Sequence, residues 1–553
     1  MTAGILLAVA AAITLDVDVS PIKDQRNSSC RPDLGYAGCL TEVSQYNDAF
    51  STWAYGAGIK ETEKALRGCG ARLLRQWDAV REWQRGMSGA GNCASPKAYW
   101  SLWKKMGVKV LLTLEHYGVW PDKRCRKERT GDIKRVTRVI CDYARWIRQN
   151  GYQDVVAGFE LGNEPYFGND PEAYAERWCA ILPELLRVWP DAKIGIPIAE
   201  YRAGDPDLDV VRKRLGEKKM MAGGGEFEIN RFNQWSGRFI VAMSNQLDSV
   251  THVIYHFYGG DAAYGCSASG FGRVKAFAKI YPQIADKRVW ITEWRERSDE
   301  DMRCHQMFAS TLFKGHYMLS VLAQPNIDGI NLHAIGACAG ALNVSMNCAF
   351  QGEGWRSAFV FQSDPRQGYD FYLDPDAGPG IRRYELGPAA PLFRIYNDAL
   401  MAHPVILDHG TLGGQGPGSS CWSSAIFYGS SNAQRDFLNK GGKWKDRPPI
   451  KGNVEWIAAL DPGKTSLAIL MCSTMDTPQE LPLKLVNAEF AGGASLRSAS
   501  CPPELIYHYS VPGERPLWTS DSRKLTSGFE GTEATLTIDP DTVQAYVIPL
   551  AKQ

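Results

Sequence analysis

The chain has 553 residues, of which 44% are hydrophobic and 22% are charged, so it is long enough for more than one folded domain. Its 62 basic and 61 acidic residues leave a net charge of +1, which argues against a dedicated nucleic-acid-binding protein. After the N-terminal segment no apolar run is long enough to span a bilayer, so we expect no membrane-embedded domain.

The N-terminal run Met1–Ala12 is apolar and rich in small residues, like the hydrophobic region of a secretory signal peptide, although no Lys or Arg precedes it. An apolar first strand that continues into Ile13–Val19 is the alternative interpretation. We predict a signal-peptide remnant over residues 1–15 and a secreted or periplasmic protein.

The 14 cysteines are irregularly spaced and include no CxxC pair, so neither a zinc ribbon nor a redox motif is expected. Cys30 and Cys39 bracket one loop, and Cys338 and Cys348 bracket another. We predict a local disulfide in each loop, as in proteins of oxidising compartments. Buried free thiols are the alternative.

Strand-like and helix-like segments alternate from about residue 71 to residue 402. The expected strands are Arg72–Trp77, Val108–Glu115, Val155–Leu161, Lys193–Ile198, Val250–Tyr258, Arg288–Glu293 and Ile327–His333. The expected helices are Pro96–Met106, Asp132–Asn150, Pro171–Val188, Asn230–Asn245, Gly272–Tyr281, Glu300–Leu322 and Pro391–Ala402. With Asp16–Val19 or Ser51–Gly58 as an opening strand, the total is eight. The pattern predicts an α/β fold, a (β/α)8 TIM barrel over residues 16–402.

The segment Gly336–Leu386 is rich in Gly, Pro, Asp and aromatic residues and is expected to be a long loop at the mouth of the barrel. Short β-like runs split by turn residues follow residue 403, namely Ser419–Tyr428, Val454–Leu460, Ser466–Cys472, Leu481–Leu485, Leu505–Tyr509, Ala534–Ile538 and Val543–Leu550. Their spacing predicts an all-β sandwich over residues 403–553.

Two of the predicted barrel strands end on a carboxylate. One is followed by Asn163-Glu164-Pro165, and the other ends in Thr292-Glu293-Trp294. Glycosidases need two carboxyl groups on opposite sides of the scissile bond, and a barrel presents such groups at the C-terminal ends of its strands. We therefore predict Glu164 and Glu293 as the catalytic pair, with Asn163 as a ligand for a sugar hydroxyl. A simple turn at Asn163-Glu164-Pro165 is the alternative.

Other residues at predicted strand ends are expected to line the mouth. His256 and Tyr258 alternate at the end of one strand, so both can face the mouth and bond the nucleophile. Arg75 is expected to keep a carboxylate charged, or else to pair with Asp78. Glu160 is expected to point into the barrel and pair with a base. The remaining predicted substrate-binding residues are Glu115, His116, Trp120, Trp294, His333 and Trp355.

No metal or other cofactor is expected, because the spacing of His252 and His256 falls on a strand rather than a helix. The basic run from Lys123 to Lys127 is typical of a solvated face but could attract an acidic polysaccharide. The expected partner is a polysaccharide or oligosaccharide, with uronic acids among its candidate sugars.

These motifs resemble those of clan A retaining glycoside hydrolases. The run Phe159–Pro165 is similar to the heparanase and β-glucuronidase group, whereas Thr292-Glu293-Trp294 is similar to the β-xylosidase and iduronidase group. The resemblance implies a barrel with a β-sandwich, Glu164 as acid/base, Glu293 as nucleophile and retention at the anomeric carbon. Two alternatives stay open from the residues alone, an inverting glycosidase on the same barrel and a non-catalytic carbohydrate-binding protein.

Overall fold

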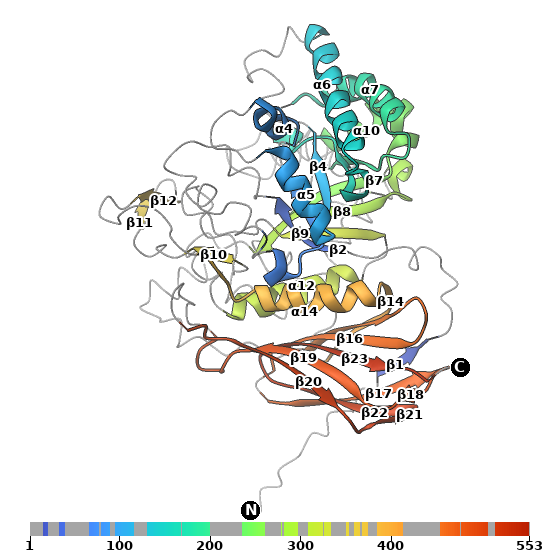
Figure 1. The fold of residues 1–553 in the computed structure, drawn as a ribbon, viewed down its shortest axis with the longest axis vertical. Coiled ribbons are helices and arrows are strands. Elements are labelled where there is room, and N and C mark those ends of the chain that lie inside the picture. Colours follow the sequence, from blue (N-terminus) through green and yellow to red (C-terminus); the bar gives the residue numbers. More distant parts are fainter. Residues whose placement is uncertain are drawn as a thin grey trace, which may run out of the picture.

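The computed structural model describes twenty stretches of the chain. They are residues 15–19, 33–38, 63, 66–76, 79–88, 95–114, 130–167, 169–198, 235–259, 278, 281–296, 308–323, 326–332, 350–352, 359–364, 368–373, 384–412, 454–475, 477–506 and 515–551. Figure 1 shows the barrel and a separate β domain stacked on each other, with two helices, α12 (Phe308–Leu322) and α14 (Ala390–Ala402), between them.

Eight parallel strands form a closed barrel in chain order, consistent with the predicted (β/α)8 fold. They are β2 (Asp33–Gly38), β3 (Leu73–Gln76), β4 (Lys109–Thr113), β5 (Val156–Glu160), β6 (Ile194–Pro197), β7 (His252–Gly259), β8 (Arg288–Glu296) and β9 (Ile327–Leu332). The barrel closes where β2 pairs with β9. Seven of these strands overlap strands predicted from apolar runs, because strands covered by helices are buried on both faces.

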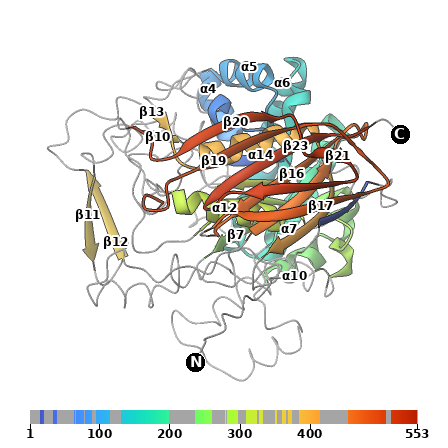
Figure 2. The same ribbon diagram turned by 90° about the horizontal axis from the view of Figure 1, so that it is seen from below.

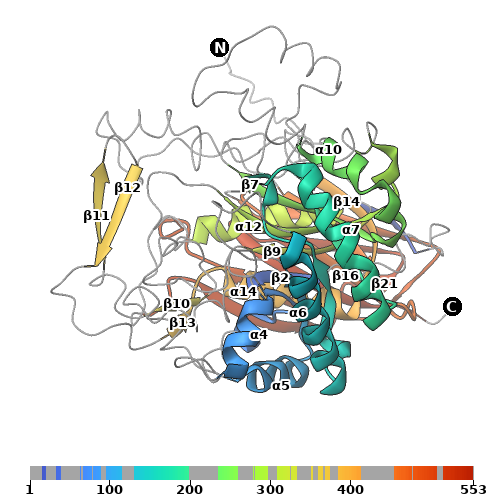
Figure 3. The same cartoon turned by 90° about the horizontal axis from the view of Figure 1, so that it is seen from above.

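Helices cover the outside of the barrel, as the view from above shows (Figure 3). They include α4 (Ala79–Ser88), α5 (Pro96–Met106), α6 (Thr130–Gln149), α7 (Pro171–Val188) and α10 (Trp235–Ala242). Short 3-10 helices are η1 (Gln153–Val155), η2 (Pro165–Phe167), η4 (Ser244–Ser249) and η5 (Pro282–Ile284). The predicted helix over Gly272–Tyr281 falls almost entirely outside the described residues.

Local capping signals explain why two helix boundaries match the sequence prediction. Ser95 caps the start of α5 through its side-chain oxygen, and Gly107 ends this helix in the left-handed conformation (φ 65°). At α7 the Asp170 side chain accepts from the backbone N–H of Ala173 at 3.0 Å, and Pro171 occupies the first turn. These signals are local, so the sequence alone contains them.

The β domain consists of two sheets packed face to face, as expected for a sandwich (Figure 1). In the view from below the strands of the two sheets overlap (Figure 2). The six-stranded sheet has the order β14 (Val405–Leu412), β15 (Val454–Leu460), β16 (Ser466–Ser473), β23 (Thr542–Pro549), β19 (Ala494–Ser500) and β20 (Thr519–Leu525). The five-stranded sheet has the order β1 (Leu15–Asp18), β17 (Gln479–Val486), β22 (Glu533–Ile538), β21 (Phe529–Gly531) and β18 (Phe490–Ala491).

The opening strand is a correction to the sequence analysis. Asp16–Val19 was expected to open the barrel, but β1 pairs in parallel with β17 in the β domain. Along β1 buried and exposed residues alternate, which suits a sheet with one face in water rather than a barrel strand buried on both sides. The barrel instead opens at β2, and the alternative opening strand Ser51–Gly58 lies outside the described residues.

The predicted mouth loop Gly336–Leu386 contains short antiparallel strands, which also differs from the prediction. They form the pairs β10 (Phe350–Gly352) with β13 (Tyr384–Leu386) and β11 (Phe359–Asp364) with β12 (Gly368–Leu373). In the β domain Leu505–Tyr509 was predicted as a strand, but Leu505 and Ile506 lie in a turn. The predicted strand Ser419–Tyr428 lies outside the described residues.

The barrel and the β domain share one continuous hydrophobic core. Residues of β15 alternate between two faces, so that Trp456 packs between the two sheets whereas Ile457 belongs to the core on the side of α12. A buried carboxylate also joins the domains, because Glu455 contacts His316 of α12 at 3.1 Å and His409 of β14 at 2.8 Å. The barrel and the β domain are therefore joined by apolar packing and by buried hydrogen bonds.

Among the described residues, no helix combines the length and the apolar character needed to cross a bilayer. The predicted disulfides, Cys30 with Cys39 and Cys338 with Cys348, fall outside the described residues. Cys141, Cys179 and Cys501, which are described, are free thiols.

Candidate functional site

The barrel interior has two layers of side chains with different chemistry. The layer nearer the N-terminal ends of the strands is apolar and contains Leu73, Leu111, Ile254 and Trp290. Side chains on one face of a strand recur every second residue, so the positions two residues further on form the next layer. That second layer is polar and contains Arg75, Thr113, Glu160, His256 and Thr292, all of them buried.

Arg75, at the end of β3, lies at the centre of the polar layer. Its guanidinium donates to both oxygens of Glu160, with Nε to Oε2 at 2.5 Å and Nη2 to Oε1 at 2.8 Å. It also donates to Glu293 Oε1 at 2.6 Å and to Asn163 Oδ1 at 2.7 Å. A planar guanidinium with five donors is suited to binding several acceptors in fixed directions, so Arg75 fixes the relative positions of β3, β5 and β8.

Glu160 is a completely buried carboxylate at the end of β5, and three residues compensate its charge. Besides Arg75, Thr113 donates its hydroxyl to Oε2 at 2.9 Å, and His256 Nε2 lies 3.9 Å from Oε1. Burial alone would raise the pKa of Glu160, but the charges and hydrogen bonds of Arg75 and His256 outweigh burial and lower it. Glu160 therefore stays ionised and serves as an anchor, which agrees with the expectation that it pairs with a base.

Glu164 lies in the turn between β5 and η2. Its backbone has a φ of 45°, which is rare for a residue with a side chain and is further disfavoured before a proline such as Pro165. Such conformations cost on the order of 1–3 kcal/mol and cluster at functional sites. The turn directs the Glu164 carboxyl toward His256 of β7, and 26% of the Glu164 side chain remains exposed.

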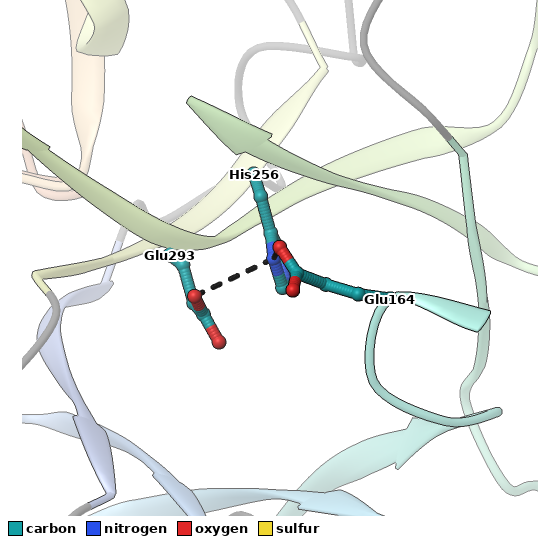
Figure 4. Close-up of side chains that lie close together, drawn as sticks. All are labelled: Glu164, His256 and Glu293. Carbon is teal, nitrogen blue, oxygen red and sulfur yellow. Dashed lines mark hydrogen bonds and ion pairs between the residues drawn. The ribbon is translucent and has the colours of Figure 1, made fainter. Parts of the chain in front are cut away.

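His256 lies between the two carboxyl groups that the sequence singled out (Figure 4). Its Nδ1 is 3.0 Å from Glu164 Oε1 and 3.5 Å from Glu293 Oε2. Burial would lower the pKa of His256, but the charge of Glu293 and the hydrogen bonds to Glu160 and Glu164 raise it to about 9. His256 is therefore a cation at neutral pH.

Glu164 and Glu293 face each other across a short gap. A ligand atom from each of Glu164, His256 and Glu293 lies within 4.8 Å of the other two, so the two carboxyl groups approach closely. With Glu160 included, this described cluster contains three carboxylates. They contact two cations, Arg75 and protonated His256. One negative charge in this cluster is therefore left uncompensated.

The same three groups are close enough to hold a small cation. Each already contacts charged protein groups, because Arg75 bonds Glu293 and protonated His256 bonds Glu164. A metal ion would be repelled by both of these positive charges at short distance. The donor set therefore fits proton transfer better than metal binding.

The structure brings five of the predicted site residues together, namely Arg75, Asn163, Glu164, His256 and Glu293. Tyr258 and Trp294 lie on β7 and β8, but their side chains are outside the described part of the chain. The other predicted residues, Glu115, His116, Trp120, His333 and Trp355, and the alternative Arg75 partner Asp78, also lie outside the described residues.

Sequence reasoning missed three residues that contact this site. Thr292 Oγ1 is 3.0 Å from His256 Nε2, Thr113 binds Glu160, and the Tyr166 hydroxyl donates to Glu164 Oε1 at 3.4 Å. Thr113 and Thr292 interrupt apolar strands two residues after Leu111 and Trp290. That break in an apolar run, on the inward face, is the signal that could have identified them.

No protein-family model matches the sequence, and no curated protein matches it either. Similarity is found instead among solved structures.

The α-L-arabinofuranosidase from Thermotoga maritima, in complex with arabinose, has a TM-score of 0.58 at 12% identity, covering 97% of this chain and 99% of its own. The GH51 α-L-arabinofuranosidase from Thermotoga petrophila RKU-1 has a TM-score of 0.57 at 11% identity, with 96% and 99% covered. A GH30 endoxylanase from Clostridium papyrosolvens C71 has a TM-score of 0.52 at 9% identity, with 97% and 100% covered. At these identities the likeness shows a shared fold, a barrel with a β domain, over nearly the full length.

Proposed function

We propose that this protein is a retaining glycoside hydrolase that cleaves a polysaccharide or oligosaccharide, with Glu164 as acid/base and Glu293 as nucleophile. The observation that carries the proposal is that one oxygen of the Glu164 carboxyl group lies within 4.8 Å of one oxygen of the Glu293 carboxyl group, beside His256. Retaining enzymes hold their carboxyl groups about 5–5.5 Å apart, whereas inverting enzymes need about 6.5–9.5 Å to admit water. The short gap favours direct attack by Glu293.

In the first step Glu293 attacks the anomeric carbon while Glu164 gives its proton to the leaving oxygen. Arg75 bonds Glu293 Oε1, so the guanidinium favours the ionised form that a nucleophile requires. Glu164 is the more exposed of the two carboxyl groups, and its side chain can reach both the leaving group and, later, a water molecule.

In the second step Glu164 takes a proton from water, which attacks the glycosyl–enzyme bond and releases Glu293. The protonated His256 stabilises the Glu164 carboxylate that exists between the steps, because its Nδ1–H donates to Oε1. The hydrolysis therefore regenerates both groups without a cofactor.

Asn163 is the proposed contact for a sugar hydroxyl next to the anomeric carbon. Its Oδ1 accepts from Arg75, so its amide orientation is set and its Nδ2 hydrogens remain for a hydroxyl acceptor. Hydrogen bonds to the 2-hydroxyl strengthen in the transition state and add to the rate.

The fold shared with arabinofuranosidases and an endoxylanase supports a glycan substrate without selecting the sugar. We also propose that the protein belongs to clan A, on the basis of its heparanase-like and xylosidase-like motifs. We further propose that its substrate contains uronic acid and that the protein is secreted or periplasmic.

The test is an activity screen of the wild-type protein on aryl glycosides and plant polysaccharides, followed by NMR of the first-formed anomer. We expect the product to keep the anomeric configuration of the substrate. For Glu164→Ala we expect a loss of about 10²–10⁴-fold on poor leaving groups, with activity on activated aryl glycosides largely kept and increased by azide. For Glu293→Ala we expect near-complete loss with both substrate types.

Inversion of configuration would contradict direct attack by Glu293. Binding of glycans by the wild type without turnover on any of them would instead support the carbohydrate-binding alternative. A matched control is Glu489→Ala, which removes a carboxyl group from the β domain and is expected to leave turnover unchanged.

A further inference from the structure

Besides the bonds of Arg75, a chain of hydrogen bonds runs through the polar layer and leads away from the reacting groups. It begins at Glu164 Oε1, crosses the imidazole of His256 and reaches Thr292 Oγ1, which lies 3.0 Å from His256 Nε2. The Thr292 hydroxyl then donates to Glu160 Oε1 at 3.5 Å. Thr292 and Glu160 are both completely buried, so no solvent competes for these bonds.

The direction of each bond follows from the acceptors at its ends. Glu160 is ionised throughout, and Glu164 is ionised between the two steps of the proposed reaction. An ionised carboxylate carries only acceptor oxygens, so in that state a proton must point toward each of them. His256 therefore carries a proton on Nδ1, which faces Glu164, and the Thr292 hydroxyl proton points to Glu160. With that proton committed, Thr292 Oγ1 can only accept from Nε2, which requires His256 to be protonated on both nitrogens.

We infer that Thr292 and Glu160 are positioning residues that hold His256 doubly protonated, with Nδ1–H directed at the acid/base Glu164. This inference rests on the proposed function. Thr292 acts on His256, and His256 acts on Glu164, so neither positioning residue needs to touch the sugar.

Glu160 thereby connects both halves of the catalytic machinery. Through Arg75 it fixes the guanidinium that bonds the nucleophile Glu293, and through Thr292 it fixes the imidazole that bonds Glu164. A single buried carboxylate sets the position of both reacting groups. This arrangement accounts for a fully buried charge in a layer where an apolar residue would cost less.

The groups that surround His256 support the same protonation state. From β5 and the following turn come Glu160 and Glu164, from β8 comes Glu293, and from β3 comes Arg75, which is bonded to two of these carboxylates. Three carboxylates against one guanidinium favour a charged imidazole. On the same strand as His256, the neighbouring Tyr255 is a buried phenol. Burial raises its pKa, so it is neutral and contributes no charge.

The experiment compares Thr292→Val with Thr292→Ser. Valine keeps the shape of threonine but removes the acceptor for Nε2–H, whereas serine keeps the hydroxyl. For Thr292→Val we expect kcat to fall about 10-fold or more with KM little changed, and the alkaline limb of the pH–rate profile to move to lower pH. Thr292→Ser should restore both. Equal behaviour of the two variants would overturn the inference.

NMR of the His256 ring nitrogens provides a readout that does not depend on turnover or on a variant that folds. In the wild type both nitrogens should show protonated shifts at pH 7.5, and a neutral ring at that pH would contradict the inference. In the Thr292→Val variant, His256 should titrate at a lower pH than it does in the wild type. A wild-type enzyme without glycosidase activity but with this titration would refute the proposed function and leave the hydrogen-bond chain intact.

Discussion

The two layers inside the barrel lie two residues apart on the same strands, yet one is packed with apolar side chains and the other contains charged groups. In one layer Trp290 fills the space opposite Gly158 and Gly195, where an added Cβ would lie 2.3 Å and 3.0 Å from the Trp290 ring. In the other layer Arg75 and Glu160 form a buried ion pair, which seldom adds net stability. The comparison shows that close packing holds the barrel together one layer below the charges that we propose do the chemistry.

The largest effect should come from Arg75→Met, which removes one of the two cations of the polar layer and leaves Glu160 and Glu293 buried without their guanidinium partner. Breaking a buried pair from one side costs about 3–5 kcal/mol, so we expect a loss of that size in urea unfolding at pH 7. Because Arg75 lowers the pKa of Glu160, the deficit should narrow as the pH falls below about 4.5 and the carboxyls protonate.

Arg75→Lys is the control, because it keeps the charge without the directional bonds. It should retain much of the stability and lose most of the turnover. An Arg75→Met variant as stable as wild type would mean that the polar layer is not held by this residue.

Trp290→Ala in the apolar layer should lower the free energy of unfolding by a similar amount, but through lost packing rather than lost charge. Removal of a large buried ring costs about 3–5 kcal/mol, because the surrounding barrel closes the cavity only in part. This variant should keep the titration of His256 near pH 9, since Arg75 and the three carboxylates are untouched. Urea unfolding across the pH range measures both the loss of stability and the pH dependence that His256 contributes. If that pH dependence disappeared in Trp290→Ala, the two layers would be coupled.

The pH dependence of wild-type stability should report the charge on His256. The pKa of this residue is about 9 in the folded protein, against about 6.5 when unfolded, so the folded state binds the proton more tightly. This contribution is fully present below about pH 6.5 and is lost as the pH rises through about 9. It is on the order of 3 kcal/mol, and it should be absent in His256→Asn. An unchanged alkaline profile in that variant would assign the effect to another group.

The sequence was informative wherever the structure depends on local chemistry or on runs of apolar residues. The helix at Pro96–Met106 was predicted to its ends because Ser95 and Gly107 mark them. Seven barrel strands were predicted because burial on both faces demands continuous apolar residues. The strand β2, with Gly35 and Gly38 in its six residues, gives no such signal, and only its pairing with β3 and β9 defines it.

Five residues of the site and the pairing of Glu160 with a base were predicted from the sequence, but the exact partners and geometry of the site were not. Arg75 meets Glu160 and Glu293 from positions 85 and 218 residues away, which only the closure of the barrel brings together. The partner of His256 depends on a register shift between Tyr255 and His256, which sets His256 beside Glu293. Such irregularities re-aim side chains near active sites, and no periodicity in the sequence reveals them.

The smallest of these effects should come from Gly158→Ala, one methyl group added to the apolar layer. The new Cβ would meet the Trp290 ring at 2.3 Å and the backbone oxygen of Lys193 at 2.9 Å, so both neighbours must move. Overpacking of this kind costs about 1–3 kcal/mol. In a Trp290→Ala background the same substitution should cost less, because the ring contact is gone and only the Lys193 oxygen remains. A double-mutant cycle measured by urea unfolding gives that difference directly, and strictly additive losses would mean that Trp290 does not pack against this strand.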